Sequence, residues 1–228
     1  MIGIIGAMDI EVENLKAQIE NKETKIISGI EFVSGKIFNK EIVVAKCGIG
    51  KVFAAICTEA MILNFKPDYI INTGVGGTLT EKLSIGDIAI SQALCQHDMD
   101  TSPIGDPKGL LSGINIINIP ADEKLIELAQ EIIKEQSINC KKGIIASGDQ
   151  FIASKVQKDF IISEFSAIAC EMEGASVAHV CYVNNVKFLV LRAISDSADN
   201  SSHMDYPTFL KMASENSTKV TLGLIERI

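Results

Sequence analysis

The sequence lacks tryptophan, and arginine occurs only twice, at Arg192 and Arg227. Aromatic side chains form the platforms on which single-stranded nucleic acids stack. Clustered basic side chains bind nucleic-acid backbones and anionic membranes, whereas this chain carries a formal net charge of -8 at pH 7. We therefore expect no nucleic acid and no membrane among its partners.

Long hydrophobic runs and paired cysteines are also missing. No uninterrupted apolar run is long enough to span a bilayer. The six cysteines are scattered without a C-x-x-C pair, and most lie in apolar runs, where cysteine behaves as a small buried hydrophobe. The first residues do not resemble a secretory signal peptide. These features predict a reduced, cytoplasmic protein.

What the sequence does contain is an alternation of strands and helices. Hydrophobic residues make up 47% of the 228 positions, enough for a sizeable core. Without a linker, repeat or low-complexity segment, we expect a single α/β domain over residues 1–228 with a mixed sheet. Short apolar runs predict strands at residues 1–6, 24–27, 31–37, 41–46, 68–72, 87–94, 142–147, 165–170 and 186–194. Periodicity and stop signals predict helices at residues 51–64, 121–137 and 206–227, with further helix starts after residues 7 and 174.

Polar or glycine-rich residues follow many of these strands. Ligands of α/β sheets gather at the ends of the strands, where the loops meet. This convergence is the strongest reason to treat Glu173 as functional. The segments concerned are residues 6–11, 73–77, 147–152, 171–173 and 192–196.

Glu171 and Glu173 lie between a predicted buried strand and a predicted helix. Alternate residues of a strand share a face, so both carboxylates could point into one cavity. A buried carboxylate is unfavourable unless it is paired or hydrogen-bonded. The alternative is that Glu173 caps the helix and Glu171 accepts from a backbone donor. Glu11 has a similar alternative, because acids at a helix N-terminus are stabilised by the helix dipole.

Two glycine clusters lie at residues 48–50 and 74–77. Neither has the G-x-G-x-x-G spacing of a dinucleotide site, and neither continues as a P-loop. The second cluster could allow a ribose or phosphate to approach the backbone. For Gly48 and Gly50 we favour close packing.

Histidine gives weak signals. His97, Asp98 and Asp100 could ligate a metal, but a solvated loop is the better interpretation of one histidine with flexible acids. The surrounding turn-rich segment is long enough to be a lid or an interface arm. His179 and His203 fit a helix face or a loop and receive no chemical role.

Taken together, the strand ends resemble the nucleoside phosphorylase superfamily, and within it the 5'-methylthioadenosine/S-adenosylhomocysteine nucleosidases. The matching segments span the chain in the family's order: residues 4–12, 47–51, 70–74, 147–149, 151–152, 171–173 and 192–196. The resemblance implies a three-layer α/β/α sandwich with a central mixed, partly barrel-like sheet. It also implies hydrolysis of the N-glycosidic bond of an adenine nucleoside, with water as co-substrate and with no metal or organic cofactor.

The resemblance assigns the proton chemistry to three residues. Asp196 is expected to protonate the leaving purine at N7, with Ser195 orienting it. Glu11 is expected to activate water on the opposite face of the ribose, and Arg192 to help hold that water. One acid and one base on opposite sides of the bond parallel the inverting glycosidases.

The resemblance also implies how the substrate is bound. Glu173 would accept the ribose hydroxyls, Met172 would pack on the sugar, and Phe151 would stack on adenine beside the Ile152 backbone. Glu171 is then structural. The remaining residues expected near the sugar and the 5'-substituent are Met8, Ile49, Val75, Tyr206 and, across a homodimer, Thr101 and Ile104.

Two departures from the family concern specificity. Val75 stands where many such nucleosidases have serine, and Ile104 and Asp106 stand where bacterial relatives often have aromatic residues. The alternatives are a 6-amino-6-deoxyfutalosine hydrolase, a purine nucleoside phosphorylase, and a nucleoside-binding protein without chemistry. A phosphorylase needs a basic phosphate site, for which two arginines are too few.

Overall fold

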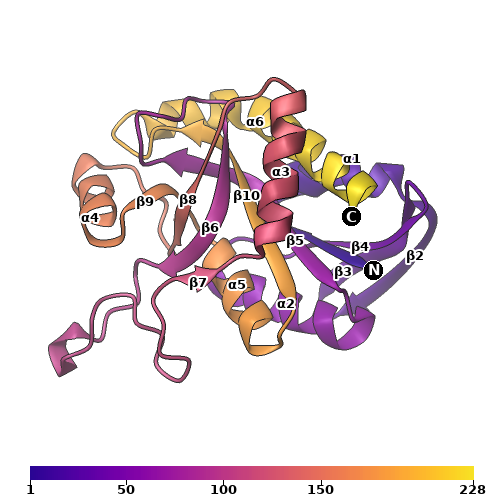
Figure 1. Ribbon diagram of the computed structural model, residues 1–228, viewed down its shortest axis with the longest axis horizontal. Helices are drawn as coiled ribbons and strands as arrows, with labels where there is room; N and C mark the ends of the chain where they lie inside the picture. The colour runs from indigo at the N-terminus through magenta and orange to yellow at the C-terminus, as the bar shows by residue number, and fades with distance from the viewer.

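The computed structural model describes residues 1–228, except for the side chains at positions 203 and 204. In the described backbone, one mixed sheet holds all ten strands, and its neighbours follow the order β10-β6-β8-β9-β5-β1-β4-β3-β2, with β7 pairing β6 (Figure 1). The strands are β1 (Ile2–Gly6), β2 (Glu20–Ile27), β3 (Ile30–Ile37), β4 (Lys40–Lys46), β5 (Tyr69–Thr78), β6 (Ile88–Gln96), β7 (Ile119–Pro120), β8 (Cys140–Ser147), β9 (Ala167–Glu171) and β10 (Lys187–Asp196).

Part of this sheet closes into a barrel. Strand β10 pairs with β6 on one edge and with β5 on the other, so β10, β6, β8, β9 and β5 form a ring. The strands β1, β4, β3 and β2 extend from β5 as an open wing, with β2 at its edge. The expectation of a partly barrel-like mixed sheet is confirmed.

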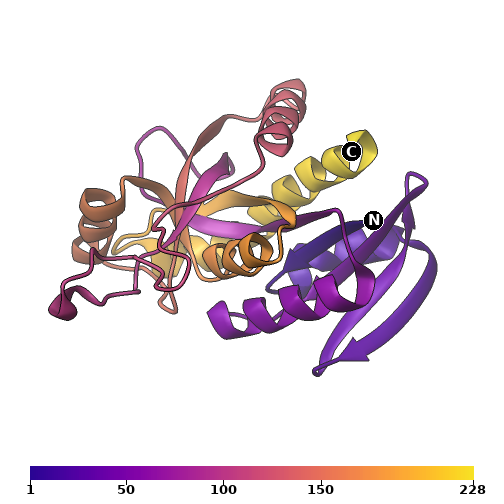
Figure 2. The same cartoon turned by 60° about the horizontal axis from the view of Figure 1, so that its bottom comes forward.

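Helices cover both faces of the sheet. On one face α2 (Lys51–Phe65) packs against α5 (Gly174–Val183). On the other, α6 (Ser202–Arg227) packs against α1 (Asp9–Gln18) and α3 (Glu123–Glu135). Figure 2 shows the α2–α5 pair on one side and α3 with α6 on the other. The helix α4 (Lys155–Phe165) lies against β8 and β9.

Strand alternation produces these layers. Ile4 and Val44 belong to the core beneath α1, α3 and α6, whereas their neighbours Ile5 and Ala45 belong to the core beneath α2 and α5. Adjacent strand residues point to opposite faces, so each apolar run contributes side chains to both cores. The expected three-layer α/β/α arrangement is therefore present.

Three local predictions differ from the structure. The sequence predicts that the fifth strand ends at residue 72, but β5 continues through the glycine cluster to Thr78. Helix α4 was not predicted; its N-cap residue Ser154 accepts a hydrogen bond from the Gln157 N–H. The last helix begins at Ser202 instead of near residue 206, and includes Pro207. Within the described residues, no helix is both long and apolar enough to cross a membrane.

Candidate active site

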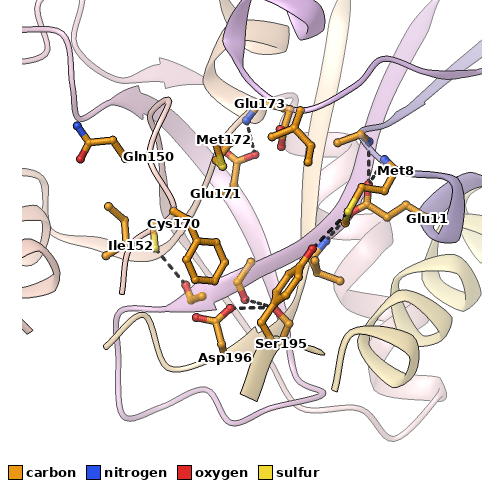
Figure 3. Close-up of a pocket in the computed structure, with 17 residues that line it drawn as sticks. Met8, Glu11, Gln150, Ile152, Cys170, Glu171, Met172, Glu173, Ser195 and Asp196 are labelled. Carbon is orange, nitrogen blue, oxygen red and sulfur yellow. Dashed lines mark hydrogen bonds between the residues drawn. The ribbon is translucent and has the colours of Figure 1, made fainter. Parts of the chain in front are cut away.

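A cavity of about 290 Å³ opens where β1, β5, β9 and β10 end. Glu171, Met172 and Glu173 approach it from one side, Ser195 and Asp196 from another, and Met8 and Glu11 from a third (Figure 3). It is lined by Ala7, Met8, Glu11, Ile49, Val75, Gly76, Gly77, Gln150, Phe151, Ile152, Cys170, Glu171, Met172, Glu173, Ser195, Asp196 and Tyr206.

Glu11 is buried and held entirely by backbone donors. Its Oε2 accepts from the N–H groups of Ala7 (2.7 Å) and Met8 (3.0 Å), and its Oε1 accepts from the N–H of Val75 (3.1 Å). A Cβ on Gly74 would lie 2.6 Å from Oε1, so the carboxylate requires glycine there. Burial raises the pKa of Glu11, although the Arg192 charge and the three backbone bonds oppose the shift. A carboxyl with a raised pKa can serve as a base near neutral pH.

Glu173 faces the cavity from the start of α5. Its Oε1 accepts from the Gly50 N–H at 2.8 Å, and its Oε2 lies 3.9 Å from Nη2 of Arg192. Burial, with the neighbouring Glu171 charge, raises the pKa of Glu173 to about 7. Glu173 occupies the N-cap position of α5, but its side chain makes no capping bond. The alternative of a capping role for Glu173 is therefore wrong.

Glu171 caps α5 instead. Its Oε2 accepts from the N–H groups of Glu173 (3.0 Å) and Gly174 (2.7 Å) and pairs with Arg192. Its Oε1 accepts from Ser147 Oγ, which in turn accepts from the Ala175 N–H at 2.7 Å. Glu171 thus ties β8, β10 and α5 together beneath the cavity, in line with the structural role expected for it.

Arg192 lies behind the two glutamates and is 2% exposed. Nη2 donates to Asn72 Oδ1 at 2.6 Å, and Nη1 donates to the carbonyl oxygens of Leu191 (2.9 Å) and Asn72 (3.3 Å). It is not among the residues that line the cavity. Its contact with a catalytic water stays a prediction, whereas its support of Glu171 is direct.

Asp196 lies at the end of β10 and is 3% exposed. Its Oδ1 accepts from the Ala198 N–H at 2.8 Å, and its Oδ2 accepts from Ser195 Oγ at 2.9 Å. A Cβ on Gly77 would lie 2.8 Å from Oδ1, so this glycine makes room for the acid. Ser195 thus contacts Asp196 directly, and the orienting role that the resemblance implies for it stays a prediction.

The side of the cavity near α6 is aromatic and thioether-rich. The rings of Phe151 and Tyr206 meet edge to face, with centroids 5.4 Å apart. The Tyr206 hydroxyl donates to Met8 Sδ at 3.3 Å. Burial raises the pKa of Tyr206 to about 12, so its hydroxyl stays protonated and available as a donor. Such a wall suits a flat base and a small apolar substituent.

Thr101 and Ile104 are not brought to this cavity. They lie on an arm, visible at the lower left of Figure 1, with a 3-10 turn at Ser102–Ile104. The Thr101 hydroxyl donates to Asp106 at 2.9 Å, and Ile104 is 82% exposed. Any contact of these residues with substrate would have to be made in a second copy of the chain.

Comparison with known protein families identifies the superfamily. The family described as "Phosphorylase superfamily" matches residues 1–226. The chain belongs to the phosphorylase superfamily.

Among solved structures of the superfamily, this member is similar to futalosine hydrolase of Helicobacter pylori strain 26695, with 41% identity and a TM-score of 0.96 over 100% of this chain and 97% of that one. It is equally similar to an aspartate-to-asparagine variant of the H. pylori 5'-methylthioadenosine/S-adenosylhomocysteine nucleosidase with 5'-methylthioadenosine in its active site (40%, TM-score 0.96, 100% and 98% covered). The nucleosidase of Neisseria meningitidis in complex with methylthio-immucillin-A matches at 33% identity and a TM-score of 0.96, with 100% and 99% covered. The resemblance drawn from the sequence is confirmed.

Several residues that line the cavity were not predicted from the sequence. Gly76, Gly77 and Gln150 lie within the predicted strand-end segments, and Ala7 directly precedes Met8. Cys170 looked like an ordinary core cysteine, and only its place beside Glu171 could have indicated the cavity. Its thiol donates to the Gly77 carbonyl at 3.7 Å.

The histidines contribute nothing to this cavity within the described residues. The interpretation as a solvated loop is wrong for His97, which is buried, and its neighbour Asp98 is bound by Lys51 at 2.7 Å. His179 lies on α5, and the side chain of His203 lies outside the part of the chain that the structure describes. Among the described side chains, no group of three or more His, Cys, Asp or Glu is placed to hold a metal ion.

Proposed function

We propose that the protein hydrolyses the N-glycosidic bond of 5'-methylthioadenosine, S-adenosylhomocysteine and 5'-deoxyadenosine, releasing adenine and the 5-substituted ribose. The observation that carries this proposal is that Glu11, Glu173 and Asp196, far apart in sequence, line a single cavity. The two nucleosidases named above match this chain over its full length, which supports the proposal.

The mechanism follows from how the three acids are held. Breaking the bond builds positive charge on the ribose and negative charge on the purine. Asp196, held by Ser195 and the Ala198 N–H, donates a proton to the leaving base. Glu11, oriented by backbone donors, removes a proton from the attacking water, whose oxygen bonds to the anomeric carbon. Glu173 accepts the ribose hydroxyls and so fixes the sugar between acid and base.

Hydrolysis is favoured over phosphorolysis because both arginines are already paired with carboxylates. Arg192 is buried and paired with Glu171, and Arg227 is paired with Glu135 at the surface, away from the cavity. Neither is free to bind a phosphate ion. A phosphorylase would need such a cation beside the ribose.

A second candidate substrate is 6-amino-6-deoxyfutalosine, which shares the adenosine half. The similarity to H. pylori futalosine hydrolase supports it. The test compares kcat/KM for adenine release from 5'-methylthioadenosine, S-adenosylhomocysteine and 6-amino-6-deoxyfutalosine with one enzyme preparation. We expect turnover of the first two. Turnover of 6-amino-6-deoxyfutalosine alone would replace the proposal with the second candidate, and turnover of none would overturn both.

We also propose a cytoplasmic homodimer that acts in methionine salvage and in clearing products of the methyl cycle. On α2, Val52, Phe53 and Ile56 are 68%, 54% and 40% exposed, spaced to form one apolar stripe beside Ile49. Contiguous exposed apolar surface is typical of a protein interface. A second copy would cover this stripe and bring its arm, with Ile104, to the cavity. Sedimentation velocity tests this: Phe53→Glu should give a monomer, and a monomeric parent protein would contradict the dimer.

A further inference from the structure

Three charged residues that the proposed mechanism does not use meet beside the cavity. Lys51 begins α2, Asp98 follows β6, and Asp149 follows β8. Each belongs to a segment that the sequence singled out: the first glycine cluster, the His97 loop and the turn at residues 147–152. None of the three lines the cavity itself.

Their hydrogen bonds form a closed triangle. Lys51 Nζ donates to Asp98 Oδ1 at 2.7 Å, and Asp98 Oδ2 accepts from the Asp149 N–H at 2.9 Å. The triangle closes because Asp149 Oδ1 accepts from the Lys51 N–H at 2.8 Å, which caps α2 from another segment. We refer to Lys51, Asp98 and Asp149 as the triangle.

Two of the triangle's side chains, Lys51 and Asp98, are partly shielded from water, and the third, Asp149, is exposed. The side chains of Lys51 and Asp98 are 19% and 18% exposed, unlike those of a surface ion pair. Burial alone would raise the pKa of Asp98, but the bonds from Lys51 and the Asp149 N–H outweigh it and hold the pKa below its usual value. Lys51 Nζ also donates to Gln96 Oε1 at 3.2 Å, and Ser176 Oγ of α5 donates to the Lys51 carbonyl at 2.7 Å.

The triangle adjoins the ribose carboxylate through Gly50. The Gly50 N–H donates to Glu173 Oε1 at 2.8 Å, and Gly50 is directly followed by Lys51. Gly50 has φ +99°, and a Cβ there would lie 3.0 Å from Asp149 Oδ1. The backbone is therefore fitted against Asp149 at the point where it binds Glu173. The expectation of mere close packing for Gly50 is incomplete.

We propose that Lys51, Asp98 and Asp149 are positioning residues, which hold the Gly50 N–H on the Glu173 carboxylate and thereby set the geometry of the ribose site. Two cavity residues are close to the triangle in sequence: Ile49 lies two residues before Lys51, and Phe151 lies two residues after Asp149. The role of Glu173 as a ribose ligand rests on the proposed function; the effect on its carboxylate does not.

The proposal predicts a change in how Glu173 titrates. The groups that act on its carboxylate are Glu171 on the same segment, Glu11 of α1, Arg192 of β10 and the Gly50 N–H before α2; Cys47 and Tyr206 are also within electrostatic reach. The Gly50 N–H stabilises the charged carboxylate and so lowers the Glu173 pKa, whereas Glu171 and Glu11 raise it; losing the Gly50 donor should therefore raise the Glu173 pKa further.

The test measures that pKa by 13C NMR of glutamate carboxyl groups, assigned with Glu173→Gln. Lys51→Met and Asp98→Asn should each shift the Glu173 midpoint upward by about half a pH unit or more. Lys51→Arg, which keeps the positive charge, should leave the midpoint close to that of the parent protein. Lys155→Met, which removes an exposed ion pair with Asp159, is the matched control and should leave it unchanged. Asp149→Ala, which removes the acceptor of the Lys51 N–H, serves if the first two variants do not fold and should likewise raise the midpoint. An unchanged midpoint in the folded variants overturns the proposal.

A second readout uses substrate. The variants should lower kcat/KM for 5'-methylthioadenosine about tenfold or more, and lower it much less for its 2'-deoxy analogue, which lacks a hydroxyl for Glu173. An equal loss with both substrates means a general structural role and contradicts the proposal. If the parent protein cleaves neither nucleoside, the proposed function fails, while the NMR result still decides whether the triangle positions Glu173.

Discussion

Glu11 Oε1 accepts a hydrogen bond from the backbone N–H of Val75 at 3.1 Å, although the two residues are 64 positions apart. The bond joins the first turn of α1 to the middle of β5, where the cavity begins. Because the other carboxylate oxygen is held by the Ala7 and Met8 N–H groups, the side chain cannot rotate freely. A base that is fixed before substrate arrives loses little entropy in the reaction.

The variant Glu11→Gln should bind 5'-methylthioadenosine but turn it over at least about a hundredfold more slowly. An amide has one oxygen, so its NH2 group must face at least one of the three backbone donors. An unsatisfied buried donor costs about 1–3 kcal/mol, and we expect that loss of unfolding free energy as well. Single-turnover kinetics, calorimetric binding and urea unfolding measure the three effects. Glu13→Gln, on the exposed side of the same helix, is the control and should behave as the parent.

The variant Asp196→Asn should keep the fold and lose turnover by about two to four orders of magnitude. Its amide oxygen can still accept from the Ala198 N–H, and its NH2 can donate to Ser195 Oγ, so no buried group loses a partner. The measurement is adenine release together with a thermal melt. Near-parental activity would remove Asp196 from the role of acid.

The variant Glu171→Ala should destabilise the protein by about 3–5 kcal/mol, because it leaves the buried Arg192 charge without its closest partner. The N-terminus of α5 loses its cap at the same time. Guanidinium unfolding measures the loss against Glu164→Ala, an exposed glutamate of α4. A difference below about 1 kcal/mol would mean that Glu171 does not hold this part of the structure together.

Glu173 should make stability fall as the pH rises from about 4.5 to about 7. Its pKa is raised from 4.5 to about 7 in the folded protein, so between these values the folded state binds more protons than the unfolded state. The unfolding free energy then decreases with pH, at up to about 1.4 kcal/mol per unit. In Glu173→Gln this contribution should vanish. Unfolding curves of both proteins between pH 4 and 8 test it, and parallel pH dependences would contradict the raised pKa.

The parts of the structure that could be predicted are those with a local signal in the sequence. The apolar run that contains Ile4 and Ile5 predicts, from sequence alone, a strand that is buried on both faces. The position of the residues that follow this strand is then predicted as well. The triangle of Lys51, Asp98 and Asp149 could not be found in this way, because it depends on three loops meeting in space. The extension of β5 through Gly74 was missed because glycine usually signals a turn, whereas here it makes room for the Glu11 carboxylate.

The most direct test of the account is adenine release from 5'-methylthioadenosine in buffer freed of phosphate. Absorbance records the base, and a reducing-sugar assay records the other product. We predict equal amounts of adenine and free 5-methylthioribose, at a rate that added phosphate does not change. Release that requires phosphate and yields a sugar 1-phosphate would contradict the hydrolytic mechanism and assign the protein to the phosphorylases.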